Sequence, residues 1–392
     1  MFILLTAVWF SRKLFKLVKF PSMFGEVFAG VLVGPAILGW VGETEAIQML
    51  AELGIFFLMF HSGLEMTPHD LLRASKKGLW VALGSVVPFA GGFFLSRWYG
   101  YDVNTSLFVA MGLATTAVTI TTRLFRDLKI LHHQVSHVTN GAAIINEVFV
   151  LVLFSVILDL AQTGNVDPLH IMGLVAKVLL YFLLVFYLGQ RCFQYLYKVL
   201  YKGNKGFTFT LIVALFFGVM AELIGLHMII GAFMAGLFIR RELLDPEVYA
   251  KIEDRVFGLS YSFLGPIFFA TLAFHLDFSA FYSAPWFVFW IFVIAVLGKL
   301  IGSALPALWS GMSRIESLAV SVAMNGRGAV ELIIASLGLQ AGIISEEIFS
   351  VLVIIAFGTT LLSIISLKLL VPYLLDKGAQ MTLWEKMKKV VT

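Results

Sequence analysis

Charge and cysteine are scarce in this sequence of 392 residues. Charged residues make up 13% of the chain and hydrophobic residues 60%, whereas soluble domains carry roughly 25% charged residues. The single cysteine, Cys192, excludes an intramolecular disulfide framework and a cysteine-rich metal site. There is no glycine-rich phosphate loop, and roughly 20 residues after Val371 are too few for a nucleotide-binding module. The composition predicts an all-α polytopic membrane protein that forms a single transmembrane unit.

Long apolar runs recur along the whole chain. A run of about 20 residues can cross the hydrocarbon core of a bilayer as a helix. Thirteen runs are predicted to do so: Met1–Phe10, Phe24–Val41, Ile47–Leu64, Leu79–Ser96, Ser106–Thr122, Val138–Leu160, His170–Gly189, Phe207–Ile224, Leu226–Phe238, Gly258–Leu276, Trp286–Trp309, Glu316–Leu339 and Ile348–Val371. The first run is too short, so either its helix continues past Arg12 and Lys13 or residues are missing upstream.

Lysine and arginine gather in alternate connections between these runs. The rich connections hold three or four basic residues, for example Arg123, Arg126 and Lys129, except for one that holds Arg314 alone, and the connections between them hold none or one. Basic loops stay on the cytoplasmic side of a membrane. The pattern therefore predicts a cytoplasmic C-terminus, with a tail over residues 376–392, and an extracytoplasmic N-terminus.

The two halves of the chain share short motifs in the same order. Gly25–Gly30 reads GEVFAG and Gly231–Gly236 reads GAFMAG, while Ile55–Phe57 and Ile267–Phe269 both read IFF. These offsets of 206 and 212 residues align two six-helix halves, about 1–165 and 205–375, around a linker helix at about 168–200. Seven spans separate matching helices, so the halves are expected to be inverted, as in secondary transporters. Chance similarity among glycine-rich helices is the alternative.

Two runs contain residues that favour a break in the helix. Thr115–Thr122 is a cluster of hydroxyl and β-branched residues, which favour helix only weakly, and Asn325–Gly328 places two glycines and an arginine inside an apolar run. Unwound backbone at membrane depth is tolerated only where it lines a cavity or is buried in protein. We therefore expect two crossed, discontinuous helices whose dipole ends are neutralised by charged side chains.

Glu147 is the leading candidate for chemistry, because an acid at membrane depth is costly and usually functional. Desolvation favours the neutral form of a carboxyl group, so Glu147 can exchange a proton for a cation near neutral pH. Lys299 lies at the centre of an apolar run and is expected to neutralise Glu147 or a helix end. The predicted ligands of a monovalent cation are Glu147, Asn146 and Thr116, and the residues predicted to support the crossover are Thr116, Thr119, Arg327 and Glu331.

The same residues also have purely structural interpretations. Glu147 can be a permanently protonated or ion-paired glutamate, Lys299 can extend toward the membrane surface, and Arg327 with Glu331 can be a stabilising pair along one helix face. Glu26 and Glu222 lie near predicted helix ends and are expected to be solvated or bonded to backbone groups. Glu65 and Asp277 cap equivalent helices, where we expect solvation at the helix end, with a place at the mouth of a cavity as the alternative. His61, His227 and His275 are scattered singly without metal-site spacing, and no cofactor is expected.

Six motifs occur in order over nearly the whole chain: Phe24-Gly25-Glu26, Gly34-Pro35, Glu52-Leu53-Gly54, Gly63-Leu64-Glu65, Gly231-Ala232-Phe233 and Pro266-Ile267-Phe268-Phe269. Together they resemble the monovalent cation:proton antiporter-2 family, which includes sodium/proton antiporters and the membrane domains of potassium efflux proteins. The resemblance implies exchange of Na⁺ or K⁺ for H⁺ by a homodimer in the lipid of the bacterial inner membrane. It also implies core helices at about 79–160 and 286–371 that move like an elevator against a dimerisation scaffold.

Two positions depart from the family's pattern. The chain has Asn146-Glu147 where members carry aspartate, and the common Pro-Arg-Gly-Glu appears as Gly326–Ala329, with the acid displaced to Glu331. With one membrane carboxylate in place of two, we predict one-for-one, electroneutral exchange on Glu147. A cation channel or uniporter on the same fold, and a non-transporting sensor or assembly protein, are the alternatives. No nucleic-acid partner is expected, because the basic residues report topology.

Overall fold

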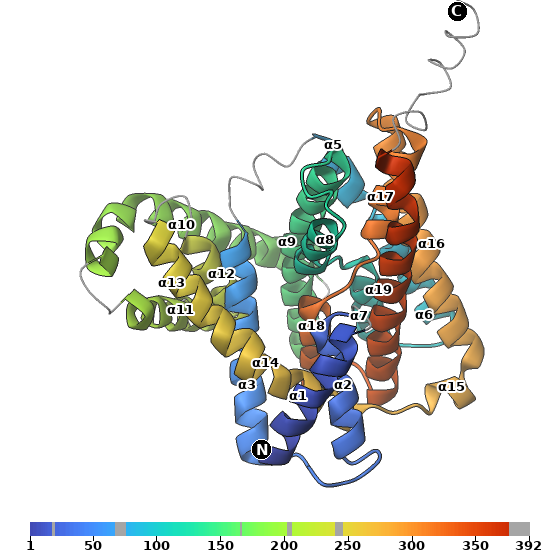
Figure 1. The fold of residues 1–392 in the computed structure, drawn as a ribbon, viewed down its shortest axis with the longest axis horizontal. Coiled ribbons are helices and arrows are strands. Elements are labelled where there is room, and N and C mark those ends of the chain that lie inside the picture. Colours follow the sequence, from blue (N-terminus) through green and yellow to red (C-terminus); the bar gives the residue numbers. More distant parts are fainter. Residues whose placement is uncertain (18–19, 67–75, 165–166, 202–205, 240–245, 376–392) are drawn as a thin grey trace, which may run out of the picture. The chain divides into compact units, whose positions relative to one another are not determined.

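The computed structural model describes residues 1–17, 20–66, 76–164, 167–201, 206–239 and 246–375. Regular structure in these residues is helical, as predicted, and they contain no strand. The chain divides into two compact units, each built from two stretches of sequence. Figure 1 labels the helices of both stretches in chain order. Unit 1 is Met1–His69 with Ser155–Leu276, and unit 2 is Asp70–Phe154 with Asp277–Thr392.

Apolar helices dominate both units. Seven helical stretches of the described residues are long and apolar enough to cross a membrane: Glu45–Glu65, Lys76–Trp98, Val103–Asp127, Gln134–Thr163, Glu247–His275, Pro285–Trp309 and Glu346–Leu375. The chain is therefore an integral membrane protein, as its composition predicts. Other predicted spans correspond to shorter apolar helices, so the total of thirteen stays a prediction.

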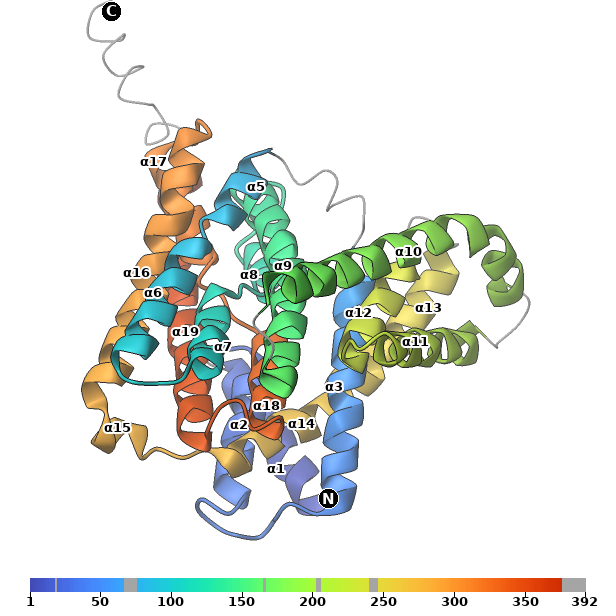
Figure 2. The ribbon, with the colours of Figure 1, turned by 180° about the vertical axis from the view of Figure 1, so that it is seen from behind.

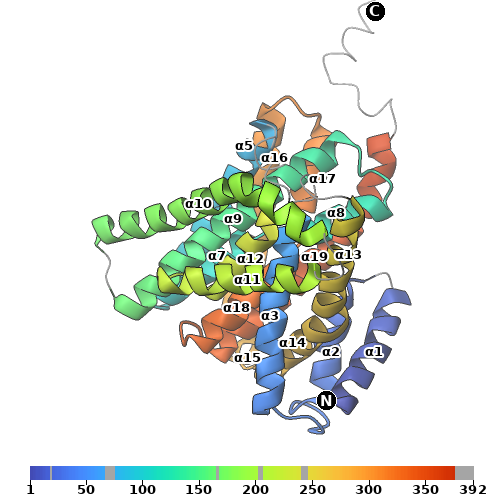
Figure 3. The ribbon, with the colours of Figure 1, turned by 90° about the vertical axis from the view of Figure 1, so that its left-hand side faces the viewer.

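Unit 1 combines helices from both of its stretches of sequence. Its helices are α1 (Phe2–Leu17), α2 (Ser22–Val33), α3 (Glu45–Glu65), α10 (Pro168–Tyr201), α11 (Gly206–Leu223), α12 (Met228–Phe238), α13 (Pro246–Phe257), the π-helix η1 (Gly258–Leu264), α14 (Gly265–Leu272) and the 3₁₀-helix η2 (Ala273–His275). Helices α1 and α2 lie side by side (Figure 3). Helix α1 continues past Arg12 and Lys13, which is one of the two explanations offered for its short apolar run.

The matched glycine motifs make equivalent contacts in unit 1. A Cβ atom on Gly30 would lie 2.0 Å from the Ala270 carbonyl oxygen, and one on Gly236 would lie 2.2 Å from the Phe60 carbonyl oxygen. Helix α2 therefore packs backbone to backbone on α14, and α12 packs in the same way on α3. Each motif contacts the helix that carries the IFF sequence of the other half. The inverted orientation of the halves stays a prediction.

Two expectations about unit 1 are wrong. Glu26 is not solvated: its side chain is buried and pairs with Arg12 at 3.3 Å, which the continuation of α1 makes possible. The span predicted to begin at Gly258 begins earlier, because α13 leads directly into η1. Lys251 and Arg255, which the predicted spans leave in the connection between Phe238 and Gly258, lie on α13. Their four-residue spacing places them on one face of a helix, and low hydropathy alone concealed the helix.

Unit 2 contains the interrupted helices. Its members are α5 (Lys76–Leu83), α6 (Val86–Trp98), α7 (Val103–Ala114), α8 (Val118–Asp127), α9 (Gln134–Thr163) as far as Phe154, α15 (Ala280–Ser283), α16 (Pro285–Trp309), α17 (Arg314–Ala323), α18 (Ala329–Gln340) and α19 (Glu346–Leu375). Both predicted breaks are present, between α7 and α8 and between α17 and α18. Helices α6 and α16 lie side by side (Figure 2).

A third break, between α5 and α6, lies inside the predicted span Leu79–Ser96. Pro88 explains it, because proline has no N–H for the Gly84 carbonyl four residues earlier and its ring crowds that carbonyl. At the break the chain touches α16 backbone to backbone: a Cβ atom on Gly84 would lie 1.6 Å from the Gly302 carbonyl oxygen. The same approach brings Lys299, one turn earlier on α16, to the break.

We predict that Gly302→Ala destabilises the protein. The added methyl group would lie 2.1 Å from the Gly84 carbonyl oxygen, so α16 must move, at a cost of about 1–3 kcal/mol. The thermal unfolding midpoint of the detergent-solubilised protein should fall. Gly173→Ala on α10 is the control, since no atom lies within 4 Å of its added Cβ atom. Equal midpoints for the two variants would contradict the prediction.

Candidate functional site

The last turn of α7 is the starting point of the site. A helix that ends leaves its final carbonyls without intrahelical donors and carries partial negative charge there. Two cationic side chains satisfy these carbonyls. Arg327 donates from Nη2 to the Leu113 carbonyl at 3.0 Å and from Nη1 to that of Gly112. Lys299 donates from Nζ to the carbonyl of Ala114 at 2.5 Å.

Arg327 is held on several sides at the break between α17 and α18. Its side chain is fully buried, and Nη1 also donates to Glu331 Oε1 at 2.8 Å. Its backbone N–H donates to Thr360 Oγ1 at 2.8 Å, and that hydroxyl donates back to the Arg327 carbonyl at 3.0 Å. A buried guanidinium needs such partners to offset its desolvation. The structure thus places Arg327 and Glu331 together as an ion pair.

Lys299 connects all three breaks. It is fully buried, which contradicts the interpretation of a lysine extended toward the membrane surface. Besides the Ala114 carbonyl, Nζ donates to Ser85 Oγ at 2.9 Å, in the α5–α6 break, and to Thr116 Oγ1 at 2.8 Å, in the α7–α8 break. Thr116 Oγ1 then donates to the Met324 carbonyl at 2.8 Å, at the end of α17. These three acceptors, together with the Asn146 oxygen described next, surround an ammonium group that has three N–H donors.

Asn146 belongs to the same network. The orientation of its amide that satisfies every neighbour places the oxygen 2.7 Å from Ser85 Oγ and 3.2 Å from Lys299 Nζ, with the nitrogen 3.2 Å from the Ala82 carbonyl. Asn146 therefore supports the lysine from α9. Asn146 does not line the pocket described below. Its role as a direct cation ligand stays a prediction.

Glu147, the next residue of α9, faces the opposite kind of helix end. Its Oε1 accepts a hydrogen bond at 3.1 Å from the N–H of Val118, the first residue of α8, and its side chain is buried. The N-terminus of a helix presents free N–H groups and partial positive charge, which favour an anion. One break thus offers its negative end to two cations and its positive end to a carboxylate.

The two broken segments touch where they pass each other. The N–H of Ala117 donates to the Gly326 carbonyl at 2.9 Å. A Cβ atom on Gly328 would lie 2.6 Å from that of Ala117, so only glycine allows this approach. The contact holds the unwound stretches together and gives the buried backbone its hydrogen bonds.

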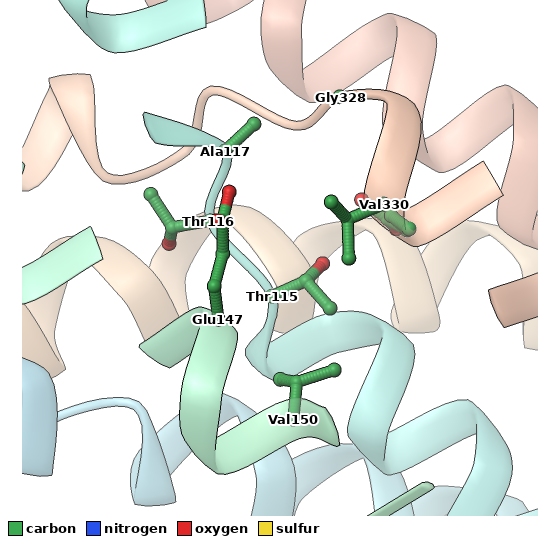
Figure 4. Close-up of a pocket in the computed structure, with 8 residues that line it drawn as sticks. Thr115, Thr116, Ala117, Glu147, Val150, Gly328 and Val330 are labelled. Atoms are coloured by element: carbon green, nitrogen blue, oxygen red, sulfur yellow. The ribbon is translucent and has the colours of Figure 1, made fainter. Parts of the chain in front are cut away.

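A small pocket opens beside this contact (Figure 4). It has room for about one water molecule. Its lining combines two acids, two hydroxyls and small or branched apolar residues: Thr115, Thr116, Ala117, Glu147, Val150, Gly328, Val330 and Glu331. Figure 4 shows the Glu147 side chain rising from α9 toward the backbone of Thr116 and Ala117. Carboxylate, hydroxyl and carbonyl oxygens are the ligands that hard cations prefer.

Most of the residues singled out from the sequence meet in unit 2. Glu147, Thr116 and Glu331 line the pocket, and Thr116 joins Asn146 and Lys299 in the network next to it. Thr119 lies in the first turn of α8 and does not line the pocket. Three residues of the site were missed: Ser85, Thr115 and Thr360. Pro88 signalled the break at Ser85, and Thr115 lay inside the noted cluster.

The family match and the similar known proteins all describe sodium/hydrogen exchangers or antiporters. Residues 1–372 match the family described as "Sodium/hydrogen exchanger, transmembrane". The chain is 31% identical to the "Probable Na(+)/H(+) antiporter GerT" of Bacillus cereus over 338 residues, covering 85% of this chain and 88% of that protein. It is 30% identical to the "Na(+)/H(+)-K(+) antiporter GerN" of the same organism over 347 residues, 88% of each chain.

A solved structure shows the same fold. The sodium proton antiporter MjNhaP1 from Methanocaldococcus jannaschii, at pH 8, superposes with a TM-score of 0.74. The superposition covers 94% of this chain and 96% of the other at 16% sequence identity.

We predict that Thr116→Val destabilises unit 2 by about 1–3 kcal/mol, because a buried donor and a buried acceptor lose their partner. Valine keeps the shape of threonine but neither accepts from Lys299 nor donates to Met324. Thr116→Ser retains the hydroxyl and is the matched control. The thermal unfolding midpoint should fall further for valine than for serine. The reverse order would contradict the hydrogen-bonding role.

Proposed function

The chain belongs to the sodium/hydrogen exchanger family, and we propose on that basis that it exchanges Na⁺ or K⁺ for H⁺ across a membrane. It is a transporter and not an enzyme. The observation that carries the proposal is the small oxygen-lined pocket at which Glu147 meets the first N–H of α8. Named relatives include a yeast "K(+)/H(+) antiporter 1", 28% identical over 377 residues, which supports potassium beside sodium as the cargo.

Glu147 carries either the cation or the proton, never both. As a carboxylate it contributes negative charge to a pocket whose Thr115, Thr116 and Glu331 oxygens replace water around the ion. When Glu147 takes up a proton, that charge is lost and the ion leaves. Binding of the two cargoes is therefore mutually exclusive, which is the requirement for obligatory exchange.

One-for-one exchange on Glu147 moves no net charge. This stoichiometry requires Lys299 to keep its proton through the cycle. Its three hydrogen bonds support that requirement, because loss of a proton would leave a buried oxygen without its donor. Arg327 is likewise fixed by the carbonyls of α7.

Unit 2 carries the ion in an elevator movement, and unit 1 forms the scaffold of a homodimer. The support for this division is that all residues of the pocket and of the lysine network belong to unit 2. The protein lies in the inner membrane of a bacterium, surrounded by lipid, with its C-terminus in the cytoplasm and its N-terminus outside. The lysine and arginine pattern supports that orientation.

Glu147→Gln tests the site. Glutamine retains size and hydrogen bonding but cannot release a proton, so we expect cation-driven proton flux in everted vesicles to fall to background. Glu147→Asp, with a shorter carboxylate, should keep measurable flux. Retained exchange in the glutamine variant would overturn the assignment. Cation flux without a coupled proton counter-flux in the unmodified protein would instead indicate a channel or uniporter, and flux of neither ion would indicate a non-transporting protein.

Electroneutrality predicts a rate that does not respond to voltage. In proteoliposomes, sodium-driven proton flux should be the same at 0 and at 100 mV. If one net charge crossed per cycle, a potential of 100 mV would change the free energy of that step by about 2.3 kcal/mol. Such a change can alter the rate by up to roughly 50-fold. The Glu147→Gln protein supplies the leak control. A rate that follows the membrane potential would show that a second proton is exchanged.

A further inference from the structure

A second charged feature of unit 2 lies at the far end of α8. We call it the α8–α9 corner and define it by Arg123, Arg126, Lys129 and His132. All four side chains are exposed, and Asp127 is the acid within the same segment. With His132 neutral, the segment from Arg123 to His132 has a net charge of +2. Among the described residues, no ion pair involves Arg123, Arg126 or Lys129.

The backbone at Lys129 adds a second observation. Helix α8 ends with the Ile130 N–H bonded to the Phe125 carbonyl at 2.9 Å and the Lys129 N–H bonded to that of Arg126 at 3.1 Å. This termination places Lys129 in the left-handed region, at φ 58°, the only non-glycine residue with positive φ in the described chain. Glycine is the favoured residue there. A lysine in this place has a less stable backbone and extends its charge from the corner.

The other face of α8 is firmly attached. Leu124 and Phe125 are buried in the apolar core of unit 2, and Thr121 Oγ1 donates to Asn140 Oδ1 on α9 at 3.2 Å. The first N–H of the helix bonds Glu147. Helix α8 therefore connects the corner at one end to the pocket at the other, within ten residues.

We propose that the α8–α9 corner binds the phosphate headgroup of an anionic phospholipid. The apolar span Val103–Asp127 ends at this corner, so its cations lie at the level of the lipid headgroups. Arginine and lysine side chains bind phosphate oxygens through charge-assisted hydrogen bonds. The proposal goes beyond ion exchange, since it does not depend on which cation is carried or on the stoichiometry. A bound headgroup restrains the half-helix whose opposite end holds Glu147.

The experiment compares lipids of different charge. Thermal unfolding of the purified full chain is followed in mixed micelles that contain phosphatidylcholine alone or with phosphatidylglycerol. We expect phosphatidylglycerol to raise the midpoint by about 3–5 °C, and the triple variant Arg123→Gln/Arg126→Gln/Lys129→Gln to lose at least about half of that increment. The matched control, Lys76→Gln/Lys77→Gln/Arg314→Gln, removes the same charge from α5 and α17 and should keep the increment.

Two further arms sharpen the outcome. Lys129→Gly should raise the midpoint in phosphatidylcholine, because glycine relieves the left-handed backbone, and should reduce the increment from phosphatidylglycerol. Opposite signs for these two effects separate a binding role from a structural one. The proposal is overturned if phosphatidylglycerol has no effect, if both triple variants lose the increment equally, or if soluble glycerol phosphate produces the full increment without lipid. None of these outcomes bears on ion exchange.

Discussion

Three carbonyls at the end of α7 determine how unit 2 is built. Ending a helix inside a membrane leaves backbone oxygens where no water can reach them. The chain supplies two buried cations to the carbonyls of residues 112–114. Each cation in turn requires further partners: Lys299 binds Ser85 and Thr116, and Arg327 binds Glu331. The need to satisfy one interrupted helix therefore accounts for five of the buried polar residues around it: Ser85, Thr116, Lys299, Arg327 and Glu331.

The same interruption also places an acidic side chain beside the pocket. Its second half, α8, begins with a free N–H and partial positive charge, and Glu147 occupies that position. The two cations are held by the end of α7, and Glu147 lies at the start of α8. Glycine at 328 allows the broken segments to touch, and their contact borders a pocket of one-ion size. The Glu147 side chain, the small pocket and the unwound backbone of both breaks therefore lie next to one another.

The sequence predicted the parts of this arrangement that stand out locally. Glu147, Asn146 and Lys299 are polar residues inside apolar runs, and the threonine cluster and Asn325–Gly328 both marked real breaks. Contacts between residues far apart in the sequence could not be predicted from local patterns. Arg327, for example, donates to a carbonyl 215 residues earlier in the chain. Ser85 was missed because its neighbours are apolar, although Pro88 indicated a break. The start of the α13–α14 span was wrong because charged residues on α13 lowered its hydropathy.

The distance along the chain between donors and acceptors has a consequence for biosynthesis. The Ala114 carbonyl is synthesised 185 residues before Lys299, and those of Gly112 and Leu113 more than 200 residues before Arg327. During translation, the Leu113 and Ala114 carbonyls enter the bilayer before Arg327 and Lys299 are made, whereas the Gly112 carbonyl already accepts from Thr115. Helix α16 later enters with an ammonium group that has no acceptor until it meets the segment from Ser85 to Thr116. The bonds from both cations to α7 can therefore form only after the ribosome has passed Arg327. A chain truncated before Lys299 would leave the Leu113 and Ala114 carbonyls without the donors that the longer chain supplies.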